Sequence, residues 1–236
     1  DEPILNNQYE EGVLIEPEYY IPIIPMVLVN GAEGIGTGFS TKIPPYNPID
    51  IIKNIKRLLK GKQMKEINPW WKGFQGEITK IDNLNYEIRG NYTIKNNKLI
   101  ITELPVGEWT SNYKEFLDNI IEESQNVSTK TKTSKEKKKV KETSLINYKD
   151  NNTDTKVHFE LIFEDGYLSN VENIEKEFHL CKKISITNMH LYSAEGHIKH
   201  YSSVNDIIQD YYNIRLDINQ KRKMYQLELL EFQVKI

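Results

Sequence analysis

Apolar residues recur at helical spacing in three long parts of the chain. The first covers residues 48–61 and follows Asn47, a residue typical of a helix start when proline comes next. The second begins near Thr110, and the third opens at Ser203 and continues to the end of the chain. A shorter helix is predicted around residues 171–180. Because the last periodic stretch exceeds 30 residues, it predicts the start of a coiled coil.

Between these helices the pattern changes to short runs of β-branched and aromatic residues. Four such runs follow one another in the first half of the chain, with Asn-rich turns between them, and predict an antiparallel meander. The predicted strands cover residues 76–81, 86–89, 92–94, 98–102, 156–163, 184–191 and 197–201. The whole pattern indicates an α+β fold of antiparallel strands and flanking helices that ends in one long helix.

Three segments fit neither periodicity. Residues 1–20 are acidic and irregular. Residues 21–29 are apolar and β-branched but contain two prolines, which exclude a regular helix across the segment and favour an extended, buried path. Residues 124–152 are rich in Ser, Thr, Asn and Lys. Because they hold too few apolar residues to offset the entropy of ordering, they predict a disordered surface insertion.

The composition is that of a folded protein with nearly balanced charge. The 236 residues suffice for one large or two modest domains, and 31 Lys and Arg against 34 Asp and Glu give a net charge of −3. That balance argues against a basic nucleic-acid arm or a disordered chain as the whole protein. It hides an asymmetry, because residues 127–143 hold seven lysines and two glutamates, a net of +5, which leaves −8 for the rest.

The lysine run at residues 135–141 allows three interpretations. It is a signal of the nuclear-localisation kind, an electrostatic aid to DNA binding, or simply a solvated insertion, and we favour the last.

Cysteine count and chain ends limit the cellular setting. The single cysteine, Cys181, excludes an intrachain disulfide and a multi-cysteine zinc site, as expected in a reducing compartment. No apolar run approaches the about 18 residues of a membrane-spanning helix. The chain opens on Asp1 with neither Met nor a signal-like segment and ends in mid-pattern. We therefore expect no secretion, no membrane span, and a piece of a larger protein.

Residues 30–40 place four glycines within eight positions and are the first candidate for chemistry. The segment lacks the Gly-Lys-Ser/Thr ending of a P-loop and the spacing of a dinucleotide-binding turn, so nucleotide binding is the weaker interpretation. Glycine count alone favours a tight turn with its backbone pressed against another strand. A third interpretation starts from Ile35 between two glycines, because architectural proteins push compact apolar side chains between base pairs to kink DNA.

Longer motifs around this segment resemble one family. Residues 16–44 run from Glu-Pro-Glu-Tyr-Tyr through Ile-Pro-Ile-Ile-Pro-Met-Val-Leu-Val-Asn-Gly-Ala-Glu-Gly-Ile-Gly-Thr-Gly-Phe-Ser to Thr-Lys-Ile-Pro. Further matching motifs lie at residues 69–70, 74–76, 101–106, 109–110, 199–204 and 220–223. Together they closely resemble eukaryotic DNA topoisomerase II over nearly the whole chain. The matching stretch is the one that joins the winged-helix domain to the tower domain of the breakage-reunion core.

The resemblance implies roles for individual residues. The family's intercalating isoleucine lies in the same Glu-Gly-Ile-Gly-Thr-Gly motif, which makes Ile35 the residue that enters a base step and bends DNA. Trp109 stands where the family has a DNA-contacting tryptophan, although a core aromatic is the more ordinary interpretation of the residue itself. DNA contacts are also implied for Asn30, Thr37 and Lys42. Val-Gly-Glu before the tryptophan replaces a more usual version with arginine and threonine, which weakens the expected phosphate contact.

The resemblance also indicates what this chain does not carry. In the family the nucleophilic tyrosine and its arginine neighbour lie upstream of the Glu-Pro-Glu segment, and no Arg-Tyr motif precedes Tyr9. We therefore assign the covalent step to none of the fourteen tyrosines. The acidic cluster that holds Mg²⁺ and the ATPase domain lie further upstream in the family, and no metal ligand is predicted here. The five histidines lack acidic or cysteine partners at ligand spacing, so surface roles are favoured.

As implied by the family, residues 1–20 are the tail of the winged-helix domain, residues 21–202 the tower domain, and residues 203–236 the start of the coiled coil. The parent is expected to be a nuclear homodimeric isomerase that passes one DNA duplex through a transient double-strand break in another. ATP and Mg²⁺ serve that parent and are not bound by this chain, which binds and bends double-stranded DNA without cleaving it. Two other classes stay open: a non-catalytic DNA-binding structural module, and a nucleotide-binding enzyme that uses the glycine segment.

Overall fold

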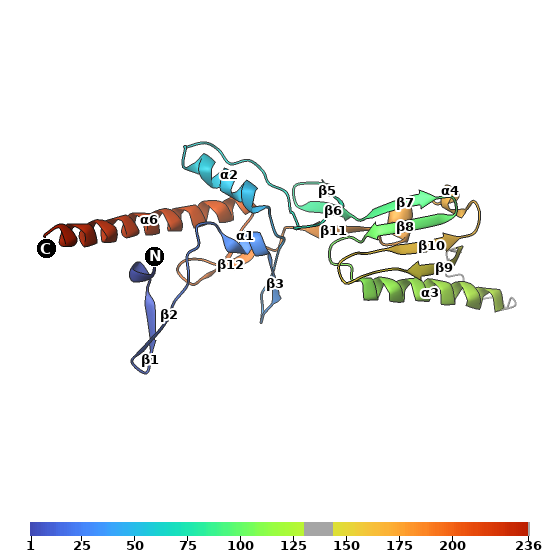
Figure 1. Cartoon of the computed structure of the whole chain (residues 1–236), viewed down its shortest axis with the longest axis horizontal. Coiled ribbons are helices and arrows are strands. Elements are labelled where there is room, and N and C mark those ends of the chain that lie inside the picture. The colour runs from blue at the N-terminus through green and yellow to red at the C-terminus, as the bar shows by residue number, and fades with distance from the viewer. Residues whose placement is uncertain (130–143, 236) are drawn as a thin grey trace. The chain divides into compact units, whose positions relative to one another are not determined.

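The computed structural model describes residues 1–129 and 144–235, and the chain forms two compact units (Figure 1). The first unit combines residues 1–72 with residues 186–236, and the second consists of residues 73–185. These limits do not coincide with the boundaries predicted at residues 20 and 202, which concern the family's domain architecture and stay a prediction. Within the described residues, no helix has both the length and the apolar character needed to cross a bilayer.

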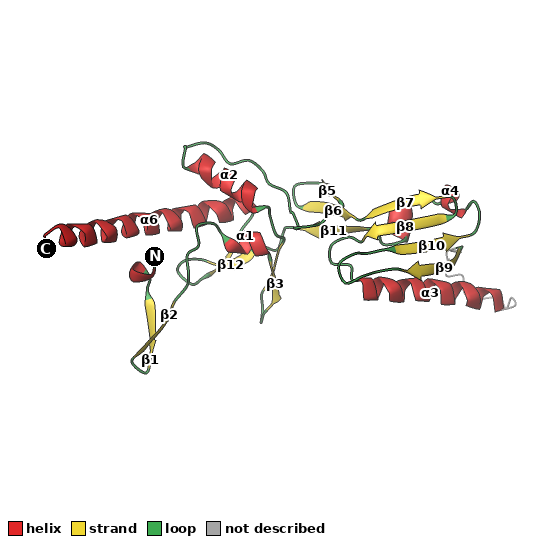
Figure 2. Ribbon diagram, in the orientation of Figure 1, coloured by secondary structure: helices red, strands yellow, loops and turns green. Residues whose placement is uncertain are grey.

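Both units combine helices with antiparallel strand pairs, which confirms the α+β fold (Figure 2). In the first unit every sheet of the described residues is a two-stranded hairpin, formed by β1 with β2, β3 with β4, and β12 with β13. The elements of this unit are the 3-10 helix η1 (Glu2–Ile4), β1 (Asn7–Glu10), β2 (Val13–Pro17), α1 (Met26–Asn30), β3 (Ala32–Ile35), β4 (Ser40–Ile43), α2 (Pro48–Leu58), β12 (His190–Tyr192), β13 (Ile198–His200) and α6 (Val204–Lys235).

Helix α2 forms where the apolar periodicity predicts it. The Asn47 side-chain oxygen accepts the Ile49 N–H at 2.9 Å, and proline occupies the first turn, where its missing N–H costs nothing. Asn54 is buried on this helix, and its side-chain amide donates to the Lys65 carbonyl at 2.8 Å and accepts the Lys65 N–H at 2.9 Å. This reciprocal pair fixes the chain that follows the helix.

Two segments of the first unit differ from the sequence prediction. Met26–Asn30 forms helix α1, although an extended path was expected across residues 21–29. Both prolines precede the helix interior, with Pro25 at the N-cap, so neither interrupts a helical hydrogen bond. Residues 7–17, expected to be irregular, form the β1–β2 hairpin around a two-residue turn.

Helix α6 is packed against the unit over its N-terminal part only. Its buried residues end at Ile218, and the buried Arg215 donates to the Asp1 carboxylate and, at 2.8 Å, to the Ile21 carbonyl. Every residue from Asn219 to Lys235 is exposed. The predicted long helix is therefore confirmed over 32 residues, whereas the coiled coil stays a prediction.

The second unit is built on two antiparallel sheets with strand orders β7-β8-β10-β9 and β11-β6-β5. Its main core gathers Leu99 and Ile101 from β8, Phe159 and Leu161 from β10, and Leu117 from α3. The elements are β5 (Glu77–Lys80), β6 (Asn85–Arg89), β7 (Asn91–Lys95), β8 (Lys98–Glu103), α3 (Thr110–Thr129), β9 (Leu145–Asp150), β10 (Phe159–Phe163), α4 (Tyr167–Asn170), α5 (Ile174–Glu177) and β11 (Cys181–Ser185).

The four predicted consecutive strands exist, but they do not form one meander. β5 and β6 pair in one sheet, whereas β7 and β8 pair in the other. Gly90 lies at the crossing, and a Cβ there would lie 2.2 Å from the Glu103 carbonyl oxygen. Only glycine fits this close approach, which lets the chain leave one sheet and enter the next.

The predicted disordered insertion is wrong at both of its ends. Residues 124–129 continue helix α3, and residues 145–150 form β9, which pairs with β10. Leu145 is buried and Tyr148 packs against the core, so a few apolar side chains suffice to order this strand. Residues 130–143, with the lysine run, lie outside the described residues. The helix expected around residues 171–180 is instead the short pair α4 and α5.

Candidate nucleic-acid interface

The glycine-rich segment forms an antiparallel hairpin, not a phosphate-binding loop. β3 and β4 pair in register from Ala32 opposite Ile43 to Ile35 opposite Ser40, and the Gly36 N–H donates to the Phe39 carbonyl at 2.8 Å across the turn. We call residues 32–43 the glycine hairpin. No helix begins directly after it, because β4 is followed by a loop up to α2. The arrangement of strand, glycine turn and helix N-terminus that cradles phosphates is therefore absent from this segment.

Ile35 is the apolar projection of the glycine hairpin. It ends β3 beside the turn and is 94% exposed, the highest fraction among the large hydrophobic side chains of the described residues. Its β-branched side chain has few rotamers, so the projection is compact and stiff. Beside it lies a recess of about 280 Å³, whose lining includes Phe39, His190, Tyr192 and Ile198.

The glycines of this region serve two different purposes. Gly31, just before the hairpin, has φ of 73°, and a Cβ there would lie 2.9 Å from the Ile43 carbonyl oxygen, so the fold itself requires glycine. Gly34 and Gly36, on either side of Ile35, have no left-handed φ. A Cβ would meet nothing within 4 Å at Gly34 and only an ordinary 3.6 Å contact at Gly36. Their bare backbone leaves room for another molecule to approach around Ile35.

The hairpin is tied to the rest of its unit through β4. The Lys42 N–H donates to the Asn188 carbonyl at 2.7 Å, and the His190 N–H donates to the Thr41 hydroxyl at 3.3 Å. The His190 ring also meets Phe39 edge to face, with ring centroids 6.1 Å apart. Residues 188–190 therefore support the strand opposite Ile35, although about 150 positions separate them from it in the sequence.

Three of the other sequence-predicted DNA contacts lie in the same region. Asn30 ends α1 and is exposed, and Thr37 is exposed in the hairpin turn. The Lys42 ammonium donates to the Glu33 carboxylate, its cross-strand neighbour, at 2.8 Å. Because an exposed ion pair contributes little, Lys42 can exchange this partner for a phosphate at small cost.

Trp109 belongs to the second unit. It immediately precedes α3 and is 72% exposed, which rules out the core aromatic interpretation. The turn before it contains Gly107 with φ of 82°, whose carbonyl accepts a hydrogen bond from the Lys182 ammonium at 3.0 Å. Lys182, which sequence reasoning did not select, therefore supplies a cation at the loop where the sequence departs from the family's arginine.

Two histidines come together that the sequence spacing did not connect. His190 and His200 are cross-strand partners in β12 and β13, with ring centroids 4.8 Å apart. His190 Nδ1 lies 2.8 Å from Asn188 Oδ1, and His200 Nε2 lies 2.9 Å from the Thr187 carbonyl oxygen. Since a backbone carbonyl only accepts, His200 Nε2 carries the hydrogen, and with the Asn188 amide oxygen turned toward the ring His190 Nδ1 does so as well. No group of three or more His, Cys, Asp and Glu side chains in the described residues could hold a metal ion.

The environments of three tyrosines oppose a nucleophilic role for these residues. Burial raises the pKa of Tyr113, and burial together with a hydrogen bond to Asp118 raises the pKa of Tyr148. Burial also raises the pKa of Tyr211 to about 12. A nucleophilic tyrosine needs the opposite environment, one that favours loss of the phenolic proton.

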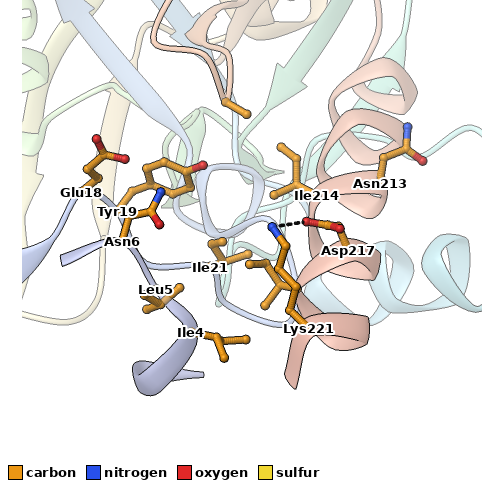
Figure 3. Close-up of a pocket in the computed structure, with 12 residues that line it drawn as sticks. Ile4, Leu5, Asn6, Glu18, Tyr19, Ile21, Asn213, Ile214, Asp217 and Lys221 are labelled. Atoms are coloured by element: carbon orange, nitrogen blue, oxygen red, sulfur yellow. Dashed lines mark ion pairs between the residues drawn. The ribbon is translucent and has the colours of Figure 1, made fainter. Parts of the chain in front are cut away.

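A second recess, of about 370 Å³, lies between the N-terminal segment and α6 (Figure 3). Its walls include Ile4, Ile21 and Ile218, and the Asp217 carboxylate at its edge pairs with the Lys221 ammonium at 2.8 Å. Asn6, Glu18 and Asn213 also line the recess, but the one cation in its lining, Lys221, is paired with Asp217, so the recess offers no unpaired cation for binding phosphate.

Comparisons with known proteins add a family to this geometry. A sequence model of the A-subunit family of DNA gyrase/topoisomerase IV matches residues 1–236. DNA topoisomerase 2 of Acanthamoeba polyphaga mimivirus is 38% identical over 287 residues, covering 100% of this chain and 23% of that protein. DNA topoisomerase 2 of Bombyx mori is 42% identical over 228 residues, covering 95% of this chain and 14% of that protein.

A solved structure supports the same family. The crystal structure of the Plasmodium falciparum topoisomerase II DNA-binding, cleavage and re-ligation domain matches with a TM-score of 0.86 and 37% identity. The match covers 98% of this chain and 30% of that one. The chain therefore spans less than a third of each of these three relatives.

Proposed function

Because the chain belongs to the A-subunit family of DNA gyrase/topoisomerase IV, we propose that it grips and bends the DNA duplex that a type IIA topoisomerase opens. In this proposal the parent enzyme is an isomerase that passes a second duplex through a transient double-strand break in the first. The chain contributes the shaping of the broken duplex and leaves the covalent step to a tyrosine elsewhere in the parent.

One observation carries the proposal: Ile35 projects almost fully exposed between two glycines that the fold does not need. Insertion of an apolar side chain between base pairs costs a few kcal/mol per unstacked step, and the bent duplex repays it by touching more protein. The missing side chains at Gly34 and Gly36 let the DNA come close enough for Ile35 to reach the base step.

Bending of this kind gives weak sequence preference. The energy depends on how easily a base step deforms, so flexible pyrimidine–purine steps are favoured over stiff ones without any reading of base edges. Asn30, Thr37 and Lys42 around the hairpin, and Trp109 with Lys182 in the second unit, then supply contacts to the backbone, which position the duplex.

The test is Ile35→Ala in the full-length enzyme. Bending of a duplex labelled at both ends is measured by fluorescence energy transfer, and we expect the bent fraction and DNA cleavage to fall together. ATP hydrolysis without DNA stays near normal. The matched control is Ile49→Ala, which removes an exposed isoleucine from α2 in the same unit. Unchanged bending by the Ile35 variant would refute the proposal that Ile35 inserts between base pairs.

The remaining parts of the proposal concern the parent enzyme. It acts as a homodimer in the nucleus with ATP and Mg²⁺, and both cofactors bind outside this chain. ATP should accordingly give no thermal protection to this chain, whereas protection would revive the nucleotide-binding alternative. A full-length parent that bends DNA but cannot relax supercoils would favour the non-catalytic structural module instead.

A further inference from the structure

Asn188 uses three of its polar groups at the base of the glycine hairpin. Its carbonyl accepts the Lys42 N–H at 2.7 Å, its side-chain Nδ2 donates to the Ser40 hydroxyl oxygen at 2.8 Å, and its Oδ1 accepts from His190 Nδ1 at 2.8 Å. With the amide in this orientation His190 Nδ1 is the donor, because the amide oxygen only accepts.

The place of the Ser40 contact matters most. Ser40 is the residue directly opposite Ile35 in the register of β3 and β4. The Asn188 side chain therefore grips the strand at the level of the exposed isoleucine, and its main chain grips it two residues further along, at Lys42. His190 adds an edge contact to Phe39 in the turn.

An inserting side chain must resist the force with which the base step closes. A two-stranded hairpin alone is marginally stable and yields under such a load. The contacts of Asn188 hold the strand opposite Ile35 against the rest of the unit, so the load passes from the isoleucine through the strand pair into the segment that precedes β12.

We propose that Asn188 is a positioning residue for DNA bending, acting through Ile35 by holding the glycine hairpin at the angle that insertion requires. The inference rests on the proposed function and deepens it, because it assigns the mechanical support of the insertion to one side chain. It predicts that loss of the amide weakens bending while the cationic contacts that hold the unbent duplex continue to act.

The experiment is a double-mutant cycle in the full-length enzyme. Asn188→Ala should lower the equilibrium between bent and unbent bound DNA about tenfold, the loss expected for about 1.4 kcal/mol of hydrogen bonding. In an Ile35→Ala background the same substitution should have no further effect, because its route of action is already removed. Affinity for a duplex gapped at the kinked step, where unstacking is already done, should stay within twofold of the unmodified enzyme.

Two further variants separate positioning from folding. Ser40→Ala removes the partner of the Asn188 amide from an exposed position and should reproduce part of the bending loss. Asn213→Ala removes an exposed asparagine on α6, which accepts from Gln209 at 3.3 Å, and should leave bending unchanged. A global destabilisation by Asn188→Ala would lower affinity for gapped and intact duplexes alike and would overturn the inference.

The outcomes also separate this inference from the proposed function. If the Ile35→Ala variant bends DNA normally, both the insertion of Ile35 and the positioning role of Asn188 are refuted. If Ile35→Ala weakens bending but Asn188→Ala has no effect, or has an equal effect in both backgrounds, only the role of Asn188 is refuted.

Discussion

Two hairpins of the first unit, β1–β2 and the glycine hairpin, both expose large apolar side chains, yet they use glycine differently. In β1–β2, Tyr9 and Val13 are well exposed, and Glu11 and Gly12 have φ of 50° and 79°. A type I′ turn needs left-handed residues at both central positions, so turn geometry accounts for Gly12. In the glycine hairpin, neither turn geometry nor packing accounts for Gly34 and Gly36.

This difference between the two hairpins shows how a functional exposed apolar residue can be recognised. Exposure alone does not distinguish Tyr9 from Ile35, because single apolar side chains are common on protein surfaces. What distinguishes Ile35 is a backbone cleared of side chains on both sides and a supporting contact from Asn188 on the opposite strand. Glycines that the fold itself does not require therefore indicate a place where another molecule comes close to the backbone.

The largest expected effect tests the glycine that the fold does explain. Gly31→Ala forces a side chain into left-handed backbone and against the Ile43 carbonyl, and should lower the local opening free energy of the glycine hairpin by about 3 kcal/mol. Hydrogen exchange of hairpin peptides in the full-length enzyme measures this. Unaltered exchange protection would mean that the strand pairing relaxes around the new methyl group.

The next effect is on DNA and not on folding. Gly34→Val adds a side chain beside Ile35 where the chain itself leaves space, so exchange protection should not fall. Without insertion the unstacking cost, about 3 kcal/mol, is no longer offset, so the ratio of bent to unbent DNA should fall about a hundredfold. Normal bending by this variant, measured by fluorescence energy transfer, would remove the distinction between the two hairpins.

Gly12→Ala is the reciprocal control. It should destabilise the β1–β2 hairpin by about 1 kcal/mol, the usual cost of a left-handed alanine, and leave DNA bending unchanged. Exchange protection of residues 7–17 and the bending assay give the two readouts. A bending defect would give β1–β2 a DNA role that its geometry does not predict.

The smallest effect concerns the cross-strand pair of Lys42 and Glu33. Lys42→Gln should reduce the slope of log affinity against log salt by about 0.9, as expected for one lost phosphate contact. Glu33→Gln frees the lysine and should raise DNA affinity about threefold at low salt, since the exposed pair is worth well under 1 kcal/mol. Salt titrations of DNA binding test both, and identical slopes in all three proteins would remove Lys42 from the interface.

Local signals predicted the parts of the fold that local energetics decide. Asn47 followed by proline defined the start of α2, and the apolar period predicted the long α6. The prediction failed where a few particular residues decide the local structure. Helix α1 forms because both prolines lie before its interior, and β9 forms because Leu145 and Tyr148 pack against the core. The β1–β2 hairpin was missed because Glu11-Gly12 is not one of the usual Asn-Gly or Asp-Gly turn pairs.

For the candidate site, the glycine-containing motif was enough to predict Ile35, Lys42 and their neighbours. The structure adds their exposure and pairing. Asn188 and His190 could not be selected from the sequence, because their proximity to β4 depends on a return of the chain after the whole second unit. Lys182 was missed for a related reason, since it meets the Gly107 carbonyl across 75 positions.

Helix α6 has a mechanical consequence. Its buried residues end at Ile218 and Arg222 still contacts the Asp1 carboxylate at 3.4 Å, whereas the 13 residues Lys223–Lys235 beyond that contact are exposed. At about 1.5 Å per residue this part is roughly 20 Å long, so it behaves as a lever held at one end. A tilt of about 5° at the held end would move the tip by roughly 2 Å over that length. Small rearrangements around Arg215 and Asp1 would thus be magnified at the tip of the helix.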